Sequence, residues 1–102
     1  MRMMSTAQGD ILKVEKIGFP VLVVSKDFFN ESGEIIACPI LREASESPLH
    51  IFLSSDGTEG YVCCEKLKLL DLRARGYKRT GRVTTAERMN IADAVQGIFD
   101  YL

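Results

Sequence analysis

Residues 71–102 read DLRARGYKRTGRVTTAERMNIADAVQGIFDYL, and this stretch holds the two strongest signals in the chain. Its second half predicts an amphipathic helix, because apolar side chains recur three or four residues apart. Thr84 and Glu87 have the spacing of a capping box, in which each side chain accepts a hydrogen bond from the other residue's backbone N–H. We therefore expect a helix from about Thr85 whose apolar stripe packs on a core. The stripe consists of Ile91, Val95, Ile98 and Leu102.

The first half of the stretch belongs to a basic window that runs from Lys66 to Arg82. This window holds seven lysine or arginine residues and one acidic residue, a local charge of +6. The rest of the chain holds six basic and thirteen acidic residues, a charge of −7. The window is either a solvated charged turn or a face that binds a polyanion or an acidic peptide. In the second case the expected binding residues are Lys66, Arg73, Arg75, Lys78 and Arg79.

Up to residue 72 the sequence consists of short apolar runs separated by turn residues. Pro39, inside one of these runs, predicts an edge strand or a bulge. Lys26 to Gly33 predicts a single helical turn followed by a loop. Several short strands closed by one late helix predict a mainly β fold, a small barrel or curled sheet covered by that helix. The expected strands are 11–16, 20–24, 34–41, 49–53, 61–65 and 67–72.

Length and composition predict one ordinary globular domain over residues 1–102, with 1–8 as a frayed lead-in. The longest apolar run, Phe19 to Val24, is far shorter than the ~20 residues of a membrane span, so no membrane association is expected. The lead-in has no hydrophobic segment and does not resemble a signal peptide. We therefore expect a cytoplasmic protein.

The three cysteines and the single histidine give no metal-binding pattern. No C-x-x-C spacing occurs, and Cys63 and Cys64 are neighbours that would point to opposite faces of a strand. A reducing compartment fits an odd number of cysteines, with Cys38 and one of the pair as small core residues. We expect no metal and no cofactor. His50 is interpreted as a structural or exposed strand residue, and Glu65 with Lys66 as a possible acid/base pair.

Several motifs, taken in order, resemble the MazF/PemK toxin family, which includes the Kid protein. The start of the family domain is matched by Gly9-Asp10-Ile11, by Pro20-Val21-Leu22-Val23-Val24 and by Phe29-Asn30. The family's V-V-V-P strand is matched by Ile35 to Ile40. Leu70 to Arg79, followed by Arg82-Val83 and the helix, is the most PemK-like part. The resemblance covers about residues 8–102.

The resemblance implies a small SH3-like antiparallel β-barrel with a C-terminal α-helix, and usually a homodimer. It also implies the toxin of a type II toxin–antitoxin system, an endoribonuclease that cleaves single-stranded mRNA without metal and is regulated by a small acidic antitoxin. Such cleavage needs a base for the 2′-hydroxyl proton, an acid for the leaving 5′-oxygen and a cation or hydrogen-bond donor for the phosphorane.

The chain departs from the family at the positions that usually supply these groups. Phe19 stands at the position of an arginine before the P-V-L strand, and Leu41 at that of a threonine after the V-P strand. The R-x-D of the PemK branch is replaced by Cys63 and Glu65. Only Glu65 keeps chemistry close to that of its family counterpart, and Arg42 is the cation next to the lost threonine.

Two hypotheses follow from these departures. In the first, the chain is a ribonuclease toxin with a rearranged catalytic site, in which Glu65 transfers protons and Arg42 or Lys66 supplies the cation. In the second, it is a catalytically degenerate family member that uses the barrel to bind an antitoxin-like peptide or nucleic acid.

Overall fold

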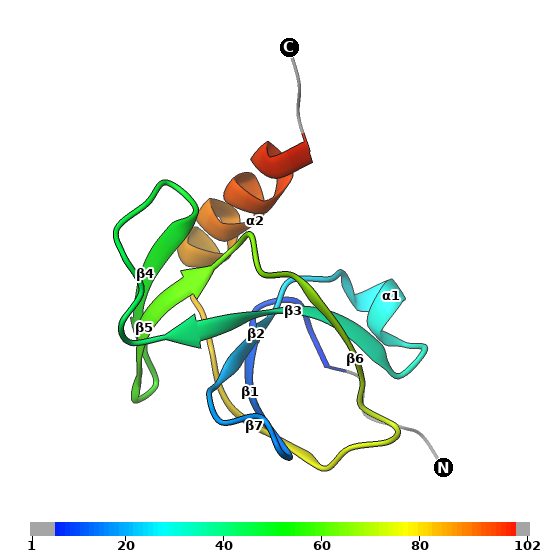
Figure 1. Ribbon diagram of the computed structural model, residues 1–102. Coiled ribbons are helices and arrows are strands. Elements are labelled where there is room, and N and C mark those ends of the chain that lie inside the picture. Colours follow the sequence, from blue (N-terminus) through cyan, green and yellow to red (C-terminus); the bar gives the residue numbers. More distant parts are fainter. Residues whose placement is uncertain (1–5, 100–102) are drawn as a thin grey trace.

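A computed structural model describes residues 6–99 of the chain. In this part of the chain the structure contains seven strands and two helices (Figure 1). In chain order they are β1 (Asp10–Val14), β2 (Val21–Val23), α1 (Asp27–Asn30), β3 (Glu34–Leu41), β4 (His50–Ser55), β5 (Thr58–Cys63), β6 (Lys68–Asp71), β7 (Tyr77–Arg82) and α2 (Thr85–Phe99). The single helical turn expected after Lys26 is confirmed as α1, and every expected strand is present within a few residues of its expected bounds.

The strands form one antiparallel sheet in the order β4-β5-β3-β2-β1-β7, and β6 pairs separately with β3. The sheet curls so strongly that the tip of the β4–β5 hairpin reaches the end of β7 (Figure 1). There the backbone N–H of Arg82 donates to Asp56 Oδ2 at 3.0 Å. A Cβ on Gly81 would lie 2.7 Å from the Asp56 Cβ, so this close approach requires glycine. The architecture is therefore a curled, half-barrel sheet with one C-terminal helix, as predicted.

Pro39 lies in the middle of the sheet, and the expectation of an edge strand or bulge at this position is wrong. It pairs in register with Val21 of β2. The next N–H along β3, that of Ile40, donates to the Pro20 carbonyl on the β2 side at 2.9 Å. Since N–H groups alternate in direction along a strand, the nitrogen of Pro39 faces the opposite side. On that side the β6 pairing ends at Ala37 and the β5 pairing begins at Ile40. The missing donor therefore falls where no partner strand requires it.

The central strands are buried on both faces, which is why Pro20 to Val24 is a continuous apolar run. Alternate residues of β2 and β3 point into two separate apolar clusters. One cluster lies between the central strands, the β4–β5 hairpin and α2, and its residues are Ile11, Leu22, Cys38, Ile40, Leu53, Val62, Cys64, Val83 and Ile91. The other lies on the opposite face beside β6, and its residues are Leu12, Val14, Val21, Val23, Ile35, Ala37, Leu70 and Leu72.

All three cysteines are buried as free thiols, one more than expected. Burial raises the pKa of the Cys38 thiol to about 12 and that of Cys64 to about 11. Both thiols therefore stay protonated at neutral pH and act as small apolar core residues rather than nucleophiles.

The end of the basic window forms strand β7, which was not among the expected strands. β7 pairs with β1 over Asp10 to Val14, and a register shift lies between Ile11 and Leu12. Apart from Gly81, every β7 residue is exposed, so the strand carries no apolar alternation that a sequence pattern could reveal. A buried carboxylate holds the strand in place, because Arg82 Nε donates to Asp10 Oδ1 at 2.8 Å.

The capping box of α2 is confirmed, but its apolar stripe packs on the core over only part of its length. The Glu87 N–H donates to Thr84 Oγ1 at 3.1 Å, and the Thr84 N–H donates to Glu87 Oε1 at 2.9 Å. Ile91 is buried and Val95 is half-buried against the core. Ile98 is exposed, which corrects the expectation, because the helix projects beyond the sheet in its last turns (Figure 1).

Leu102, the last member of the expected stripe, lies outside the described residues. Neither α1 nor α2, as described over residues 6–99, is long and apolar enough to cross a membrane.

The packing of α2 predicts unequal effects of two substitutions on the same helix. Ile91 is 2% exposed and Met89 is 60% exposed. Ile91→Ala should lower the free energy of unfolding by about 2–5 kcal/mol, because it leaves a cavity in the core. Met89→Ala should change it by no more than about 0.5 kcal/mol. Urea unfolding measures both, and equal effects of the two substitutions would contradict the docking of α2 through Ile91.

Candidate functional site

A hollow of about 520 Å³ opens on the face of the sheet that carries the second apolar cluster. We call it the basic groove, because its rim has four cationic side chains and none of its lining residues is acidic. The cations are Lys16, Lys66, Lys68 and Arg75. Glycine and apolar side chains form the remainder of the lining, and these residues are Ile17, Gly18, Phe19, Val21, Ala37, Pro39, Leu41 and Leu70.

Four separate segments bring these cations together. Lys16 occupies the turn between β1 and β2 with a φ of 68°, a left-handed conformation that is uncommon for lysine. Lys66 ends the turn after β5, where its N–H donates to the Cys63 carbonyl at 3.1 Å. Lys68 begins β6 opposite Ala37 of β3. Arg75 lies in the β6–β7 loop, which is fastened to β1 because the Glu15 N–H donates to the Gly76 carbonyl at 2.8 Å.

A second hollow of about 540 Å³ adjoins the basic groove and shares Gly18, Phe19 and Leu41 with it. We call it the mixed hollow, because both cations and carboxylates line it. Its polar lining residues are Lys13, Arg42, Asp56, Thr58, Glu59 and Thr80. Phe19 therefore lies at the boundary between the two hollows, where 39% of its surface is exposed. Arg42 lies in the mixed hollow, not in the basic groove.

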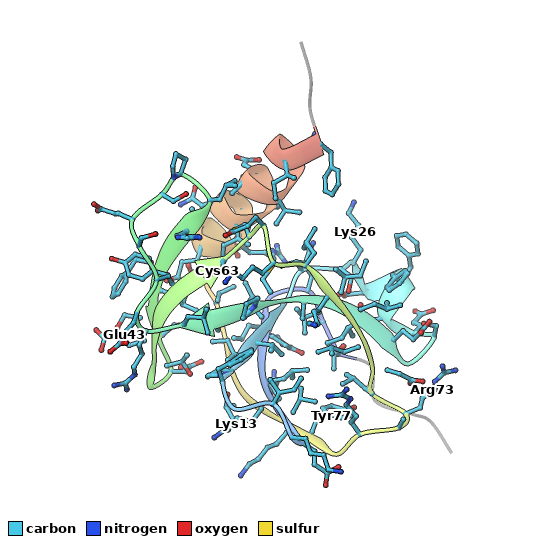
Figure 2. All side chains as sticks on the ribbon, in the orientation of Figure 1. Lys13, Lys26, Glu43, Cys63, Arg73 and Tyr77 are labelled. Carbon is cyan, nitrogen blue, oxygen red and sulfur yellow. The ribbon has the colours of Figure 1, made fainter. Side chains whose placement is uncertain are left out.

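The seven cations of the basic window do not form one face. Arg73 makes a two-pronged contact with Asp71, with its Nε 2.9 Å from Oδ1. Arg79 and Arg82 both face the buried carboxylate of Asp10, at 3.7 and 2.8 Å. Figure 2 shows Arg73 at the edge of the molecule, far from Lys13. These three arginines are therefore engaged by carboxylates of their own chain.

Of the five predicted binding residues, only Lys66 and Arg75 meet in the basic groove. Lys78 lies on β7 opposite Lys13 of β1, and Arg73 and Arg79 form the ion pairs described above. Lys16 and Lys68 were not among the predicted members of this site. The Lys-x-Lys spacing at 66–68 could have indicated Lys68 as a groove residue. No local pattern indicates Lys16, because only the fold brings it to the groove.

The predicted proton-transfer residue Glu65 faces His50, the single histidine of the chain. His50 Nε2 lies 2.9 Å from Glu65 Oε2, and Nδ1 contacts the Ser45 carbonyl oxygen. Since a carbonyl and a carboxylate only accept hydrogen bonds, both contacts are satisfied together by the protonated form of the imidazole. The ring thus connects the loop before β4 to the turn after β5. Glu65 lines neither hollow, although its neighbour Lys66 lines the basic groove.

These contacts shift both pKa values in directions that favour the ion pair. The hydrogen bond to the Ser45 carbonyl, followed by the one to Glu65, raises the pKa of His50 above its ordinary value of 6.5. The hydrogen bond from His50 lowers the pKa of Glu65 below its ordinary value of 4.5. Both partners are therefore charged at pH values well inside the range between the two shifted values.

The described part of the chain contains no cluster of metal-ligating side chains. Within residues 6–99, no group of three histidine, cysteine, aspartate or glutamate side chains is placed to hold a metal ion.

The His50–Glu65 pair predicts a pH-dependent contribution to stability. A histidine whose pKa is raised on folding stabilises the fold below its ordinary pKa, and this contribution disappears as the pH rises through the raised value. A carboxylate whose pKa is lowered on folding contributes above its ordinary pKa and loses that contribution as the pH falls through the lowered value. The advantage of the wild type over His50→Gln should therefore be greatest between the two values and shrink on either side. Urea midpoints across the pH range measure this advantage, and a constant difference would contradict the prediction.

Comparison with known proteins identifies the family of this fold. The sequence profile of the PemK-like, MazF-like toxins of type II toxin–antitoxin systems matches residues 9–99. The chain therefore belongs to the PemK/MazF toxin family. No curated protein matches it.

Solved structures of the same fold are similar over almost their whole length. A MazE–MazF crystal structure from Deinococcus radiodurans has a TM-score of 0.84 and 21% identity, with 94% of this chain and 97% of that chain covered. A mycobacterial endoribonuclease in complex with its cognate antitoxin has a TM-score of 0.82 and 20% identity, with 96% and 100% covered. The Mycobacterium tuberculosis toxin MazF-mt6 has a TM-score of 0.69 and 14% identity, with 89% and 99% covered.

Proposed function

We propose that this protein is a cytoplasmic toxin of a type II toxin–antitoxin pair and acts as an endoribonuclease that cleaves single-stranded mRNA without a metal ion. Membership of the PemK/MazF family supports the reaction class. The observation that carries the proposal for this chain is the basic groove, where four cations and no carboxylate surround a hollow of about 520 Å³. A polyanion placed there gains favourable contacts with every charged side chain of the lining.

We further propose a small acidic antitoxin as the regulatory partner and a homodimer as the functional state. Two of the similar structures described above contain the toxin together with an antitoxin. The dimer is supported by apolar side chains left on the surface in the last turns of α2, where Ile98 and Phe99 are exposed. Sedimentation at micromolar concentration measures the assembly state, and a monomer would remove the dimer from the proposal.

The decisive test of the function is cleavage by the purified protein. In the presence of a chelator the protein should cut single-stranded mRNA, and induced expression should arrest growth. Co-expression of a small acidic protein from a neighbouring gene should restore growth. Wild-type protein that binds RNA but cuts none would instead support the alternative, a catalytically degenerate module that binds nucleic acid or peptide.

Within this reaction we propose Glu65 as the proton-transfer residue and Arg42 as the cation that stabilises the phosphorane. Glu65 is supported by its exposed carboxylate and by its contact with the imidazole of His50, which can return a proton when it is protonated. Arg42 is supported by its place in the mixed hollow, beside Phe19 and Leu41. The base and the cation must act at the same phosphate, so Lys66, the neighbour of Glu65 that lines the basic groove, is the alternative cation.

Glu65→Gln tests the assignment of the base. The amide keeps the size of the side chain but cannot accept a proton, so the cleavage rate should fall by roughly 10²–10⁴ while RNA binding is retained. Glu43→Gln is the matched control, because Glu43 is an exposed loop residue that lines neither hollow (Figure 2). Single-turnover cleavage measures both variants. Equal rates for Glu65→Gln and the wild type would exclude Glu65 as the base.

A further inference from the structure

Phe19 is an exposed aromatic residue at the point where the two hollows meet. It follows the β1–β2 turn and shares the lining of both hollows with Gly18 and Leu41. The aromatic pair found within residues 6–99 lies elsewhere, between Phe52 and Tyr61, whose rings are 5.5 Å apart. The Phe19 ring thus offers surface to solvent without an aromatic neighbour from the described chain.

The side chains of the basic groove can donate hydrogen bonds but cannot accept them. Lysine and arginine have no acceptor, and the other lining side chains are apolar or glycine. None of the four groove cations takes part in an ion pair between described residues. The groove therefore suits a ligand whose charged groups only accept hydrogen bonds and whose other surfaces are flat and apolar.

Single-stranded RNA has this chemistry, and an acidic peptide has it only in part. Phosphate oxygens are acceptors, and every nucleobase has a π-face that stacks on an aromatic ring. The carboxylates of a peptide also accept hydrogen bonds, but a peptide backbone has no π-face to stack on the Phe19 ring. Bases in a duplex are already stacked on one another, so the ligand has to be single-stranded.

We propose that the basic groove binds single-stranded RNA, with one nucleobase stacked on Phe19 and the flanking phosphates held by Lys16, Lys68 and Arg75. Phe19 is then a residue that orients the RNA strand between the basic groove and the mixed hollow. The identity of the ligand rests on the proposed function, whereas the stacking contact does not depend on whether the RNA is cut.

A tryptophan reporter tests the stacking contact directly. The chain has no tryptophan, so Phe19→Trp introduces a single fluorophore at the proposed contact. The probe is a short RNA of mixed sequence with 2′-O-methyl riboses, which lacks the free 2′-hydroxyl that cleavage requires. Binding should quench the emission of Phe19→Trp. Phe52→Trp is the matched control, because Phe52 is 53% exposed and lines neither hollow, so its emission should not change.

Binding affinities test the same contact without a fluorophore. Phe19→Ala should weaken binding of the same RNA by about 5- to 150-fold, the range expected for losing one base–aromatic stack. Phe19→Tyr keeps the ring and should retain most of the affinity. Phe52→Ala should bind as the wild type does.

The salt dependence of binding tests the phosphate contacts. For single strands each phosphate contact contributes about 0.7 to the slope of log affinity against log salt concentration, so Lys68→Ala should lower that slope by about 0.7. Lys26→Ala is the control, because Lys26 is exposed beside α1, away from the groove (Figure 2), and its slope should be unchanged.

Three outcomes would overturn the proposal. These are unchanged emission of Phe19→Trp at saturating RNA, unchanged affinity of Phe19→Ala, and quenching by polyglutamate of matched charge but not by RNA. The last outcome would identify an acidic peptide as the occupant. RNA that binds with quenching but is never cut would remove the proposed cleavage activity and leave this inference standing.

Discussion

The fold depends on one eight-residue strand that pairs with three others. β3 bonds to β2 along one side, and along the other side first to β6 and then to β5. Because β6 and β5 pair with successive parts of the same side of β3, the sheet divides at the middle of this strand. The division separates the β4–β5 hairpin from β6. The two apolar clusters lie on opposite faces of the same strand, so each depends on the position of β3. Pro39 marks the point of division, because a residue without an N–H is tolerated only where no partner strand needs the donor.

The carboxylates that the fold places near the basic window determine which of its cations form ion pairs within the chain. Asp10 and Asp71 contact three of the window's arginines. Lys66, Lys68 and Arg75 are left to face the groove, where Lys16 joins them from a distant part of the sequence. Ion pairing thus reduces a broad basic segment to a small cationic site. A cationic site that is smaller than the basic segment can hold an anionic ligand at one position instead of attracting it along the whole segment.

The sequence predicted those parts of the fold whose signals are local. The apolar run at Pro20 to Val24 identified a buried strand, and Thr84 with Glu87 fixed the start of α2 to the residue. β7 was missed because its side chains are polar and exposed, and the strand forms through backbone pairing with β1 and the Asp10 contact. Such long-range contacts leave no periodicity in the sequence.

The candidate site was predictable only in part, for a related reason. Lys66 and Arg75 were identified from charge density, which is a property of a continuous segment. Lys16 lies far from them in sequence, and only the curl of the sheet brings it to the same groove. The contact between His50 and Glu65 depends likewise on the pairing of β4 with β5, in which His50 stands opposite Cys63.

The buried thiols have a consequence for how this protein can be observed. Cys38 lies at the centre of β3, and its pKa of about 12 keeps it unreactive while the sheet is closed. Cys63 ends β5 beside the His50–Glu65 contact, at the rim of the sheet. Alkylating reagents would therefore react with the two thiols at rates set by different opening motions. The alkylation rate of Cys38 would report separation of the central strands. The alkylation rate of Cys63 would report release of the loop before β4, which His50 contacts at the Ser45 carbonyl.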